Sequence, residues 1–171
     1  MESGECLSKE WNAVLSRPVL DASALASRPA PSDRPACFPY LPVSSAQGDA
    51  ALMPLLPLAL RFKDREPFAA RGLPDSGATV NVLPYGLGLR LGLVWEAQTT
   101  LVKLAGNLAA HEARAVLLQC RVADFAPVPL VFAWSRLESV PLLLGQVNFF
   151  EAFDVCFHRA RRQFEIELAR R

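Results

Sequence analysis

The sequence predicts an all-β fold, a single small barrel or sandwich built from short strands. From residue 52 onward, apolar runs of strand length recur about every ten residues, separated by turn-forming residues. Few stretches of this region show the 3.6-residue apolar period of a helix. The residues before it differ in composition, being rich in proline, serine and alanine. We therefore expect two parts: an N-terminal arm over residues 1–50 and a β domain over residues 51–171.

The N-terminal arm is expected to be flexible or extended. A short helix is plausible only over residues 9–15, because the residues that follow are interrupted by proline. Proline removes a backbone donor and is excluded from helix interiors and central strands. Its positions in the arm are Pro18, Pro29, Pro31, Pro35, Pro39 and Pro42.

The β domain divides into strands by its apolar runs and turn residues. A loop or brief helical turn is expected over residues 85–93, which contain three glycines. Gly106-Asn107 suits a tight hairpin turn, and residues 146–153 have the apolar spacing of one short C-terminal helix. The expected strands are residues 55–62, 67–73, 80–83, 99–104, 113–122, 130–134, 140–144, 154–158 and 163–168.

Composition and charge exclude several classes of function. The chain is 51% hydrophobic with a net charge of +1, which gives no electrostatic reason to expect nucleic acid or a membrane surface as partner. Its longest apolar run, residues 51–60, contains prolines and is too short to span a bilayer. We expect a cytoplasmic protein, because the acidic N-terminal residues lead into no apolar segment of a secretory signal. We expect no metal site, because no cysteine pair has metal-ligand spacing, and we expect no cofactor. The cysteines are Cys6, Cys37, Cys120 and Cys156.

One tripeptide points to a chemistry. Asp75 is followed by a hydroxyl residue, Ser76, and by Gly77, which permits a tight turn and a close backbone approach. Apolar residues lie on both sides, so a carboxylate there has to be hydrogen-bonded, paired or protonated. Considered alone, the tripeptide is better explained as a plain surface turn than as a catalytic site.

A longer pattern gives the tripeptide a family context. The run from Asp75 to Pro84, followed by Leu143-Leu144-Gly145 and by residues 149–155, resembles the retropepsin-like aspartic proteases. In that family an Asp-Thr/Ser-Gly-Ala turn supplies the catalytic carboxylate, and a later apolar-apolar-Gly segment passes behind it. The resemblance covers roughly residues 52–168. It implies a single-lobed acid-protease barrel with Asp75 as the catalytic residue and a supporting set of Ser76, Gly77, Ala78, Leu143, Leu144 and Gly145.

The resemblance also implies a homodimer. The sequence contains one Asp-Ser-Gly, so the active site would be completed by Asp75 of a second copy. Two adjacent carboxylates share one proton, which lets one activate water while the other assists the peptide carbonyl. The Ser76 side chains would hold the two Asp-Ser-Gly loops of the dimer against each other. The substrate would be a peptide bound in extended form. The family's β-hairpin flap would correspond here to Leu104, Ala105, Gly106, Asn107 and Leu108.

Two other interpretations remain open at the level of the sequence. A catalytically weak or inactive dimeric peptide-binding module would keep the same fold. Pro74 favours this alternative, because it places a residue without a backbone N–H directly before Asp75. An unrelated small β domain, in which Asp-Ser-Gly is only a turn, is the third interpretation.

Overall fold

Strands are the predominant secondary structure of the described chain. The computed structural model describes residues 34–44, 50–137 and 139–169. The helical elements are α2 (Tyr85–Arg90), α3 (Phe149–Ala152) and 3-10 turns at Trp95–Ala97, Gly106–Leu108 and Arg159–Arg161. The strands are β1 (Ala36–Pro39), β2 (Leu41–Ser44), β3 (Ala50–Met53), β4 (Leu56–Arg61), β5 (Phe68–Pro74), β6 (Asn81–Leu83), β7 (Leu101–Val102), β8 (Ala113–Val122), β9 (Val128–Ser135), β10 (Leu143–Leu144), β11 (Phe153–His158) and β12 (Gln163–Leu168).

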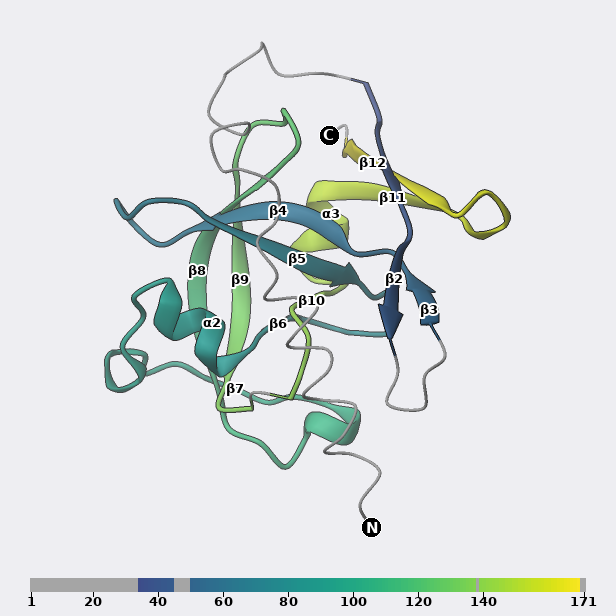
Figure 1. The fold of residues 1–171 in the computed structure, drawn as a ribbon. Coiled ribbons are helices and arrows are strands. Elements are labelled where there is room, and N and C mark those ends of the chain that lie inside the picture. The colour runs from purple at the N-terminus through teal and green to yellow at the C-terminus, as the bar shows by residue number, and fades with distance from the viewer. Residues whose placement is uncertain (1–33, 45–49, 138, 170–171) are drawn as a thin grey trace.

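Six strands close into a barrel, which confirms the predicted all-β class (Figure 1). Their order is β4-β5-β10-β6-β9-β8, and antiparallel pairing between β4 and β8 closes the ring. The short strand β7 is added at the outer side of β8. Two of the pairings are parallel: β10 with β5, and β6 with β9. Because β10 lies between β5 and β6, the end of β5 is brought next to residues far away in the sequence.

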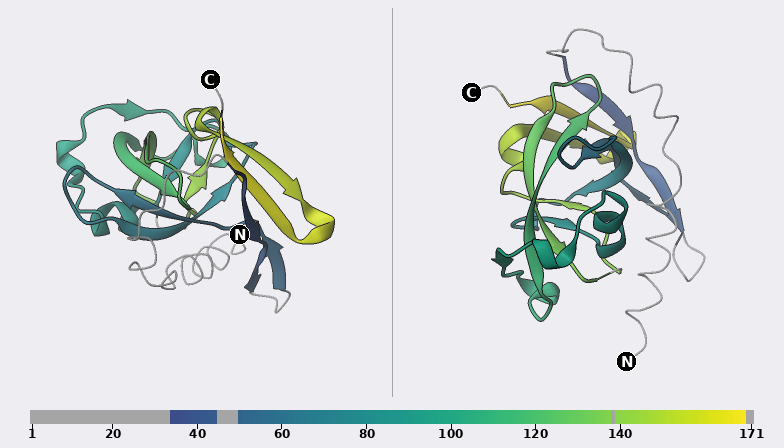
Figure 2. Two further views of the ribbon diagram at one scale, coloured as in Figure 1. Left: turned by 90° about the horizontal axis from the view of Figure 1, so that it is seen from above. Right: turned by 90° about the vertical axis from the view of Figure 1, so that its left-hand side faces the viewer.

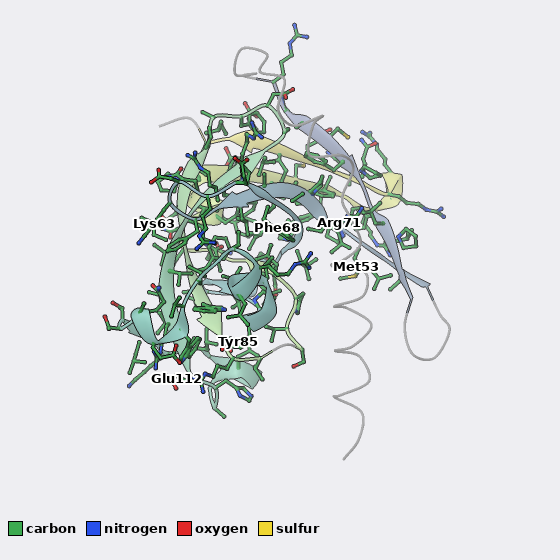
Figure 3. The ribbon with its side chains drawn as sticks, turned by 60° about the vertical axis from the view of Figure 1, so that its left-hand side comes forward. Met53, Lys63, Phe68, Arg71, Tyr85 and Glu112 are labelled. Atoms are coloured by element: carbon green, nitrogen blue, oxygen red, sulfur yellow. The ribbon has the colours of Figure 1, made fainter. Side chains whose placement is uncertain are left out.

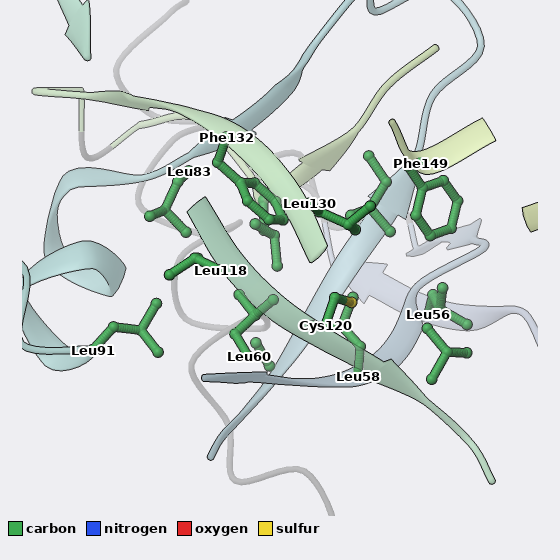
Figure 4. Close-up of a cluster of buried hydrophobic side chains, with 14 of the residues drawn as sticks. Leu56, Leu58, Leu60, Leu83, Leu91, Leu118, Cys120, Leu130, Phe132 and Phe149 are labelled. Carbon is green, nitrogen blue, oxygen red and sulfur yellow. The ribbon is translucent and has the colours of Figure 1, made fainter. Parts of the chain in front are cut away.

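The barrel interior is filled by large apolar side chains (Figure 4). In β8 the residues Val116, Leu118 and Cys120 point inward at every second position, as the strand period requires. Phe132 of β9 and Phe149 of α3 are fully buried against them. This continuous core explains why the apolar runs in the sequence predict the strands so well.

A second, smaller apolar cluster lies on the other face of the same strands. Val82 and Ala133 belong to it, whereas their neighbours Leu83, Phe132 and Trp134 belong to the main core. Its remaining buried members are Leu104, Ala113 and Val140. The layer formed by β10, β6 and β9 therefore has apolar groups on both faces.

Helix α2 covers one side of the barrel through an aromatic group. The Tyr85 ring, labelled in Figure 3 at the start of α2, stacks on Trp134 with a centroid distance of 5.5 Å. Trp95 contacts both rings edge-on, and the two tryptophans are buried. Gly88 lies directly against the Trp134 indole, where an added Cβ would collide with the ring. These residues hold α2 on the barrel.

Residues 36–39 and 41–44 of the predicted arm are strands, so this part of the arm is extended, which is one of the two forms expected for it. β1 pairs with β12 in a three-stranded sheet of order β1-β12-β11, which extends from the barrel (Figure 2), and β2 pairs with β3. Proline is tolerated because β1 is an edge strand, with Pro39 as its last residue. Phe38 and Tyr40 also pack on Phe164 at 5.5 and 5.9 Å, so this segment buries apolar surface. Residues 1–33 and 45–49 of the arm lie outside the described residues.

Two further details differ from the sequence prediction. The predicted tight turn at Gly106-Asn107 is wrong, because a 3-10 turn stands there and β7 contains only two residues. The loop over residues 103–112 joins β7 to β8 instead of a tight turn, and Leu104 of this loop packs into the second apolar cluster. The predicted strand over residues 140–144 is reduced to β10. Within the described residues, no helix is both long and apolar enough to cross a membrane.

Candidate active site

Asp75 stands at the first position after β5, in a tight turn. The backbone N–H of Gly77 donates to Asp75 Oδ1 at 2.9 Å, and Ala78 N–H donates to the Asp75 carbonyl at 3.1 Å. A Cβ on Gly77 would lie 3.2 Å from that same Oδ1, so the absence of a side chain lets the turn close tightly on the carboxylate. Asp75 is half-buried, and its Oδ2 makes no hydrogen bond to any residue that the structure describes. The turn therefore fixes one of the two carboxylate oxygens.

The segment after β10 holds this turn from behind. Asp75 N–H donates to the Leu144 carbonyl at 2.9 Å, which continues the parallel pairing of β5 with β10. Gln146 N–H donates to the Ala78 carbonyl and Val147 N–H to the Thr79 carbonyl, both at 2.9 Å. The predicted association of residues 75–78 with residues 143–145 is therefore present in the fold, through backbone hydrogen bonds at both ends of the turn.

Gly145 permits this close packing. A Cβ added to Gly145 would lie 2.5 Å from the Val80 carbonyl oxygen and 2.8 Å from that of Ala78. Both contacts are with backbone atoms, which cannot move aside as a flexible side chain would. The glycine in Leu143-Leu144-Gly145 is therefore required by the approach of two backbones.

Three polar side chains complete the support, and their roles were not predicted. Asn81 Oδ1 accepts from Gly145 N–H at 2.8 Å. Gln146 Nε2 donates to the Ser76 carbonyl at 2.9 Å, and Asn148 Oδ1 accepts from Val131 N–H at 2.9 Å. Asn81 carried one usable signal in the sequence, since a polar residue within an apolar strand has to find buried partners. Gln146 and Asn148 carried none, because they are polar residues within the predicted helix over residues 146–153.

Pro74 disrupts none of these hydrogen bonds. Leu73 and Asp75 donate their N–H groups to the carbonyls of Leu142 and Leu144, so an N–H at position 74 would face the opposite side of β5. There, β5 pairs with β4, but β4 begins at Leu56, opposite Gly72. No strand residue stands opposite position 74 on that side. The proline lies where the sheet pairing does not need a donor.

The candidate flap lies beside the second apolar cluster. Leu104 is 8% exposed and belongs to that cluster, and Leu108 and Leu143 pack against it. Ala105 and Gly106 are exposed between the two leucines, and Gly106 has φ +60°. The segment is thus packed on the barrel by a leucine at each end, with Ala105 and Gly106 exposed between them. Position 107 contributes to the 3-10 turn through its backbone.

The described residues contain no metal-binding group near this turn or elsewhere. No set of three or more histidine, cysteine or acidic side chains among them is arranged to hold a metal ion. Nor does Asp75 pair or hydrogen-bond with a second acidic side chain in the described part of the chain. Within the described residues, Asp75 is therefore a carboxylate without an acidic partner.

Comparison with known proteins adds no family assignment. No protein-family model matches the sequence, and no curated protein matches it either.

Proposed function

We propose that this protein is an aspartic endopeptidase of the retropepsin-like type, active as a homodimer. The observation that carries the proposal is the Asp75 turn, in which a half-buried carboxylate is held by Gly77 and, through its backbone, by residues 144–147. A turn that served only as a surface connection would not need a second backbone segment behind it, packed so closely that only glycine fits at position 145. The closed β-barrel around the turn supports the same proposal.

The proposed active site is formed where the Asp75 turns of two copies meet. Ser76 and Gly77 are exposed at the tip of the turn, so they are accessible to a second copy. The Ser76 side chain would brace one turn against the other, as the resemblance implies. Placed side by side, the two carboxylates cannot both ionise at low cost, so the pair holds one proton.

The proposed reaction uses this shared proton. The ionised Asp75 takes a proton from a water molecule, and the water oxygen attacks the carbonyl carbon of the peptide bond. The protonated Asp75 of the other copy donates its proton to the carbonyl oxygen, which gives a tetrahedral diol. Transfer of a proton to the amide nitrogen then breaks the C–N bond and releases an amine and a carboxylic acid. The residues that hold the turn keep the two carboxylates in register.

The apolar cluster beside the turn supports an extended peptide substrate. Leu143 is paired with Leu73 of β5 and with Val82 of β6 in the sheet, and it packs in the same cluster as Leu104 and Leu108. Residues 104–108 would close over a peptide laid along this face, and the apolar groups would contact its side chains. A non-catalytic peptide-binding dimer is the second candidate, because the described chain contributes one carboxylate and binding needs no dyad.

The test compares cleavage of a mixed peptide library by the wild type and by Asp75→Asn between about pH 4 and 7. Asp64→Asn is the matched control, because it makes the same chemical change at an exposed loop position. The proposal predicts cleavage by the wild type and by the control, and none by Asp75→Asn. Binding of peptides by all three proteins without cleavage would support the non-catalytic dimer, and equal cleavage by all three would refute the role of Asp75.

A further inference from the structure

Asn81 is a fully buried polar residue with no role in the reaction described above. It is the first residue of β6, and its two neighbours in that strand are apolar and buried. A buried amide costs free energy unless its donor and acceptor are both satisfied. The amide oxygen accepts from Gly145 N–H at 2.8 Å, and Nδ2 donates to the Val131 carbonyl at 2.9 Å. The side chain thus links two segments that belong to different strands.

These two hydrogen bonds stand where the sheet is interrupted. β6 pairs with β9 from Asn81 onward, opposite Phe132, so the backbone of Val131 lies just before that pairing begins. Asn81 satisfies the Val131 carbonyl, and Asn148 satisfies the Val131 N–H at 2.9 Å. Two asparagine side chains therefore replace the missing strand neighbour and fasten the 144–148 segment to β9.

The linked residues lead directly to the candidate catalytic group. Gly145 follows Leu144, whose carbonyl accepts the Asp75 N–H at 2.9 Å. Asn81 therefore fixes the residue next to the one that holds Asp75, and β9 provides the rigid support. A shift of Gly145 would displace the hydrogen bonds on both of its sides, and with them the carboxylate.

We propose that Asn81 is a positioning residue that sets the place of the Asp75 carboxylate through Gly145; this inference rests on the proposed function. Asparagine is specified because the site requires an acceptor toward Gly145 and a donor toward Val131 on one short side chain. Leucine has a similar volume and supplies neither group. An ionised aspartate would keep the acceptor but would set a negative charge against the Val131 carbonyl oxygen. A protonated aspartic acid restores the donor.

The main experiment measures steady-state kinetics of peptide cleavage by Asn81→Leu and Asn81→Asp. Ser135→Ala is the control for a lost buried polar group, because Ser135 is equally buried and, among the described residues, its hydroxyl hydrogen-bonds only Leu137 N–H, at 3.4 Å. We expect Asn81→Leu to lower kcat by about tenfold or more with KM within about twofold, because the carboxylate is displaced rather than the substrate site. Asn81→Asp should approach wild-type kcat at acidic pH and lose it as the pH rises.

A second measurement does not depend on cleavage. Amide hydrogen exchange of the Gly145 and Asp75 N–H groups should be faster in Asn81→Leu than in the wild type and unchanged in Ser135→Ala. A folded Asn81→Leu with wild-type kcat, or with only KM changed, would overturn the inference while leaving the proposed function in place. If Asn81→Leu does not fold, the pH dependence of Asn81→Asp decides. If the wild type cleaves no peptide, the proposed function fails. The positioning role is then tested by hydrogen exchange alone, and an Asp75 N–H exchange rate in Asn81→Leu equal to that of the wild type would overturn it.

Discussion

The substitution Gly145→Ala should destabilise the protein strongly, although it adds only one methyl group. The new Cβ would lie 2.5 Å from the Val80 carbonyl oxygen. A carbon and a carbonyl oxygen require about 3.3 Å, so the two backbones have to separate by roughly 0.8 Å. A displacement of this size takes a 2.9 Å hydrogen bond to the limit at which it is lost, about 3.5 Å. The bonds at risk are those that residues 145–147 donate to residues 78–81.

Losing these three hydrogen bonds at about 1 kcal/mol each gives an expected loss of about 3 kcal/mol in the free energy of unfolding. Urea denaturation followed by tryptophan fluorescence measures it, since Trp95 and Trp134 are buried in the fold. Gly106→Ala is the control: its Cβ meets no atom within 4 Å, but its φ is +60°. It should cost only about 1 kcal/mol, through backbone strain. A loss for Gly145→Ala no greater than that of Gly106→Ala would refute the close-approach argument.

The remaining predictions concern the core. With a thiol reagent at pH 8, the exposed Cys37 and Cys156 should react in the native protein and Cys120 only after unfolding, which mass spectrometry can assign. Burial raises the pKa of the Cys120 thiol to about 12, so the folded state keeps this proton longer than the unfolded state. The free energy of unfolding should therefore fall between about pH 9 and pH 12, and fall less steeply in Cys120→Ala. Gly88→Ala should cost about 1–3 kcal/mol by overpacking Trp134, and an unchanged urea midpoint would contradict that contact.

The barrel strands were predictable because each of them shows the apolar pattern of a strand in its own sequence. β8 was predicted with its observed bounds, since its inward positions alternate from Val116 to Val122. β10 was overestimated, because only two of its residues find strand partners even though the whole run is apolar. β1 was missed because prolines dominate its surroundings, and nothing local shows that a proline-containing segment will pair with the distant strand β12.

The candidate site was predictable to the extent that it is encoded in contiguous motifs. Asp75 and Gly145 belong to two short runs, and the fold brings those runs together. The support by Asn81 and Asn148 depends on the parallel pairing of β6 with β9, a long-range feature with no signature in the sequence. The sequence also could not show that the sheet pairing needs no N–H at position 74, because the partner opposite this position depends on where β4 begins.

The central claim is that the active site is shared between two copies, and subunit mixing tests it most directly. Wild-type and Asp75→Asn protein are mixed in equal amounts and left to exchange subunits before peptide cleavage is measured. If each site needs Asp75 from both copies, only dimers of two wild-type chains are active, and the activity should be about one quarter of that of wild type at the same total concentration. An activity of about one half would show that each chain acts alone, and would contradict the shared site.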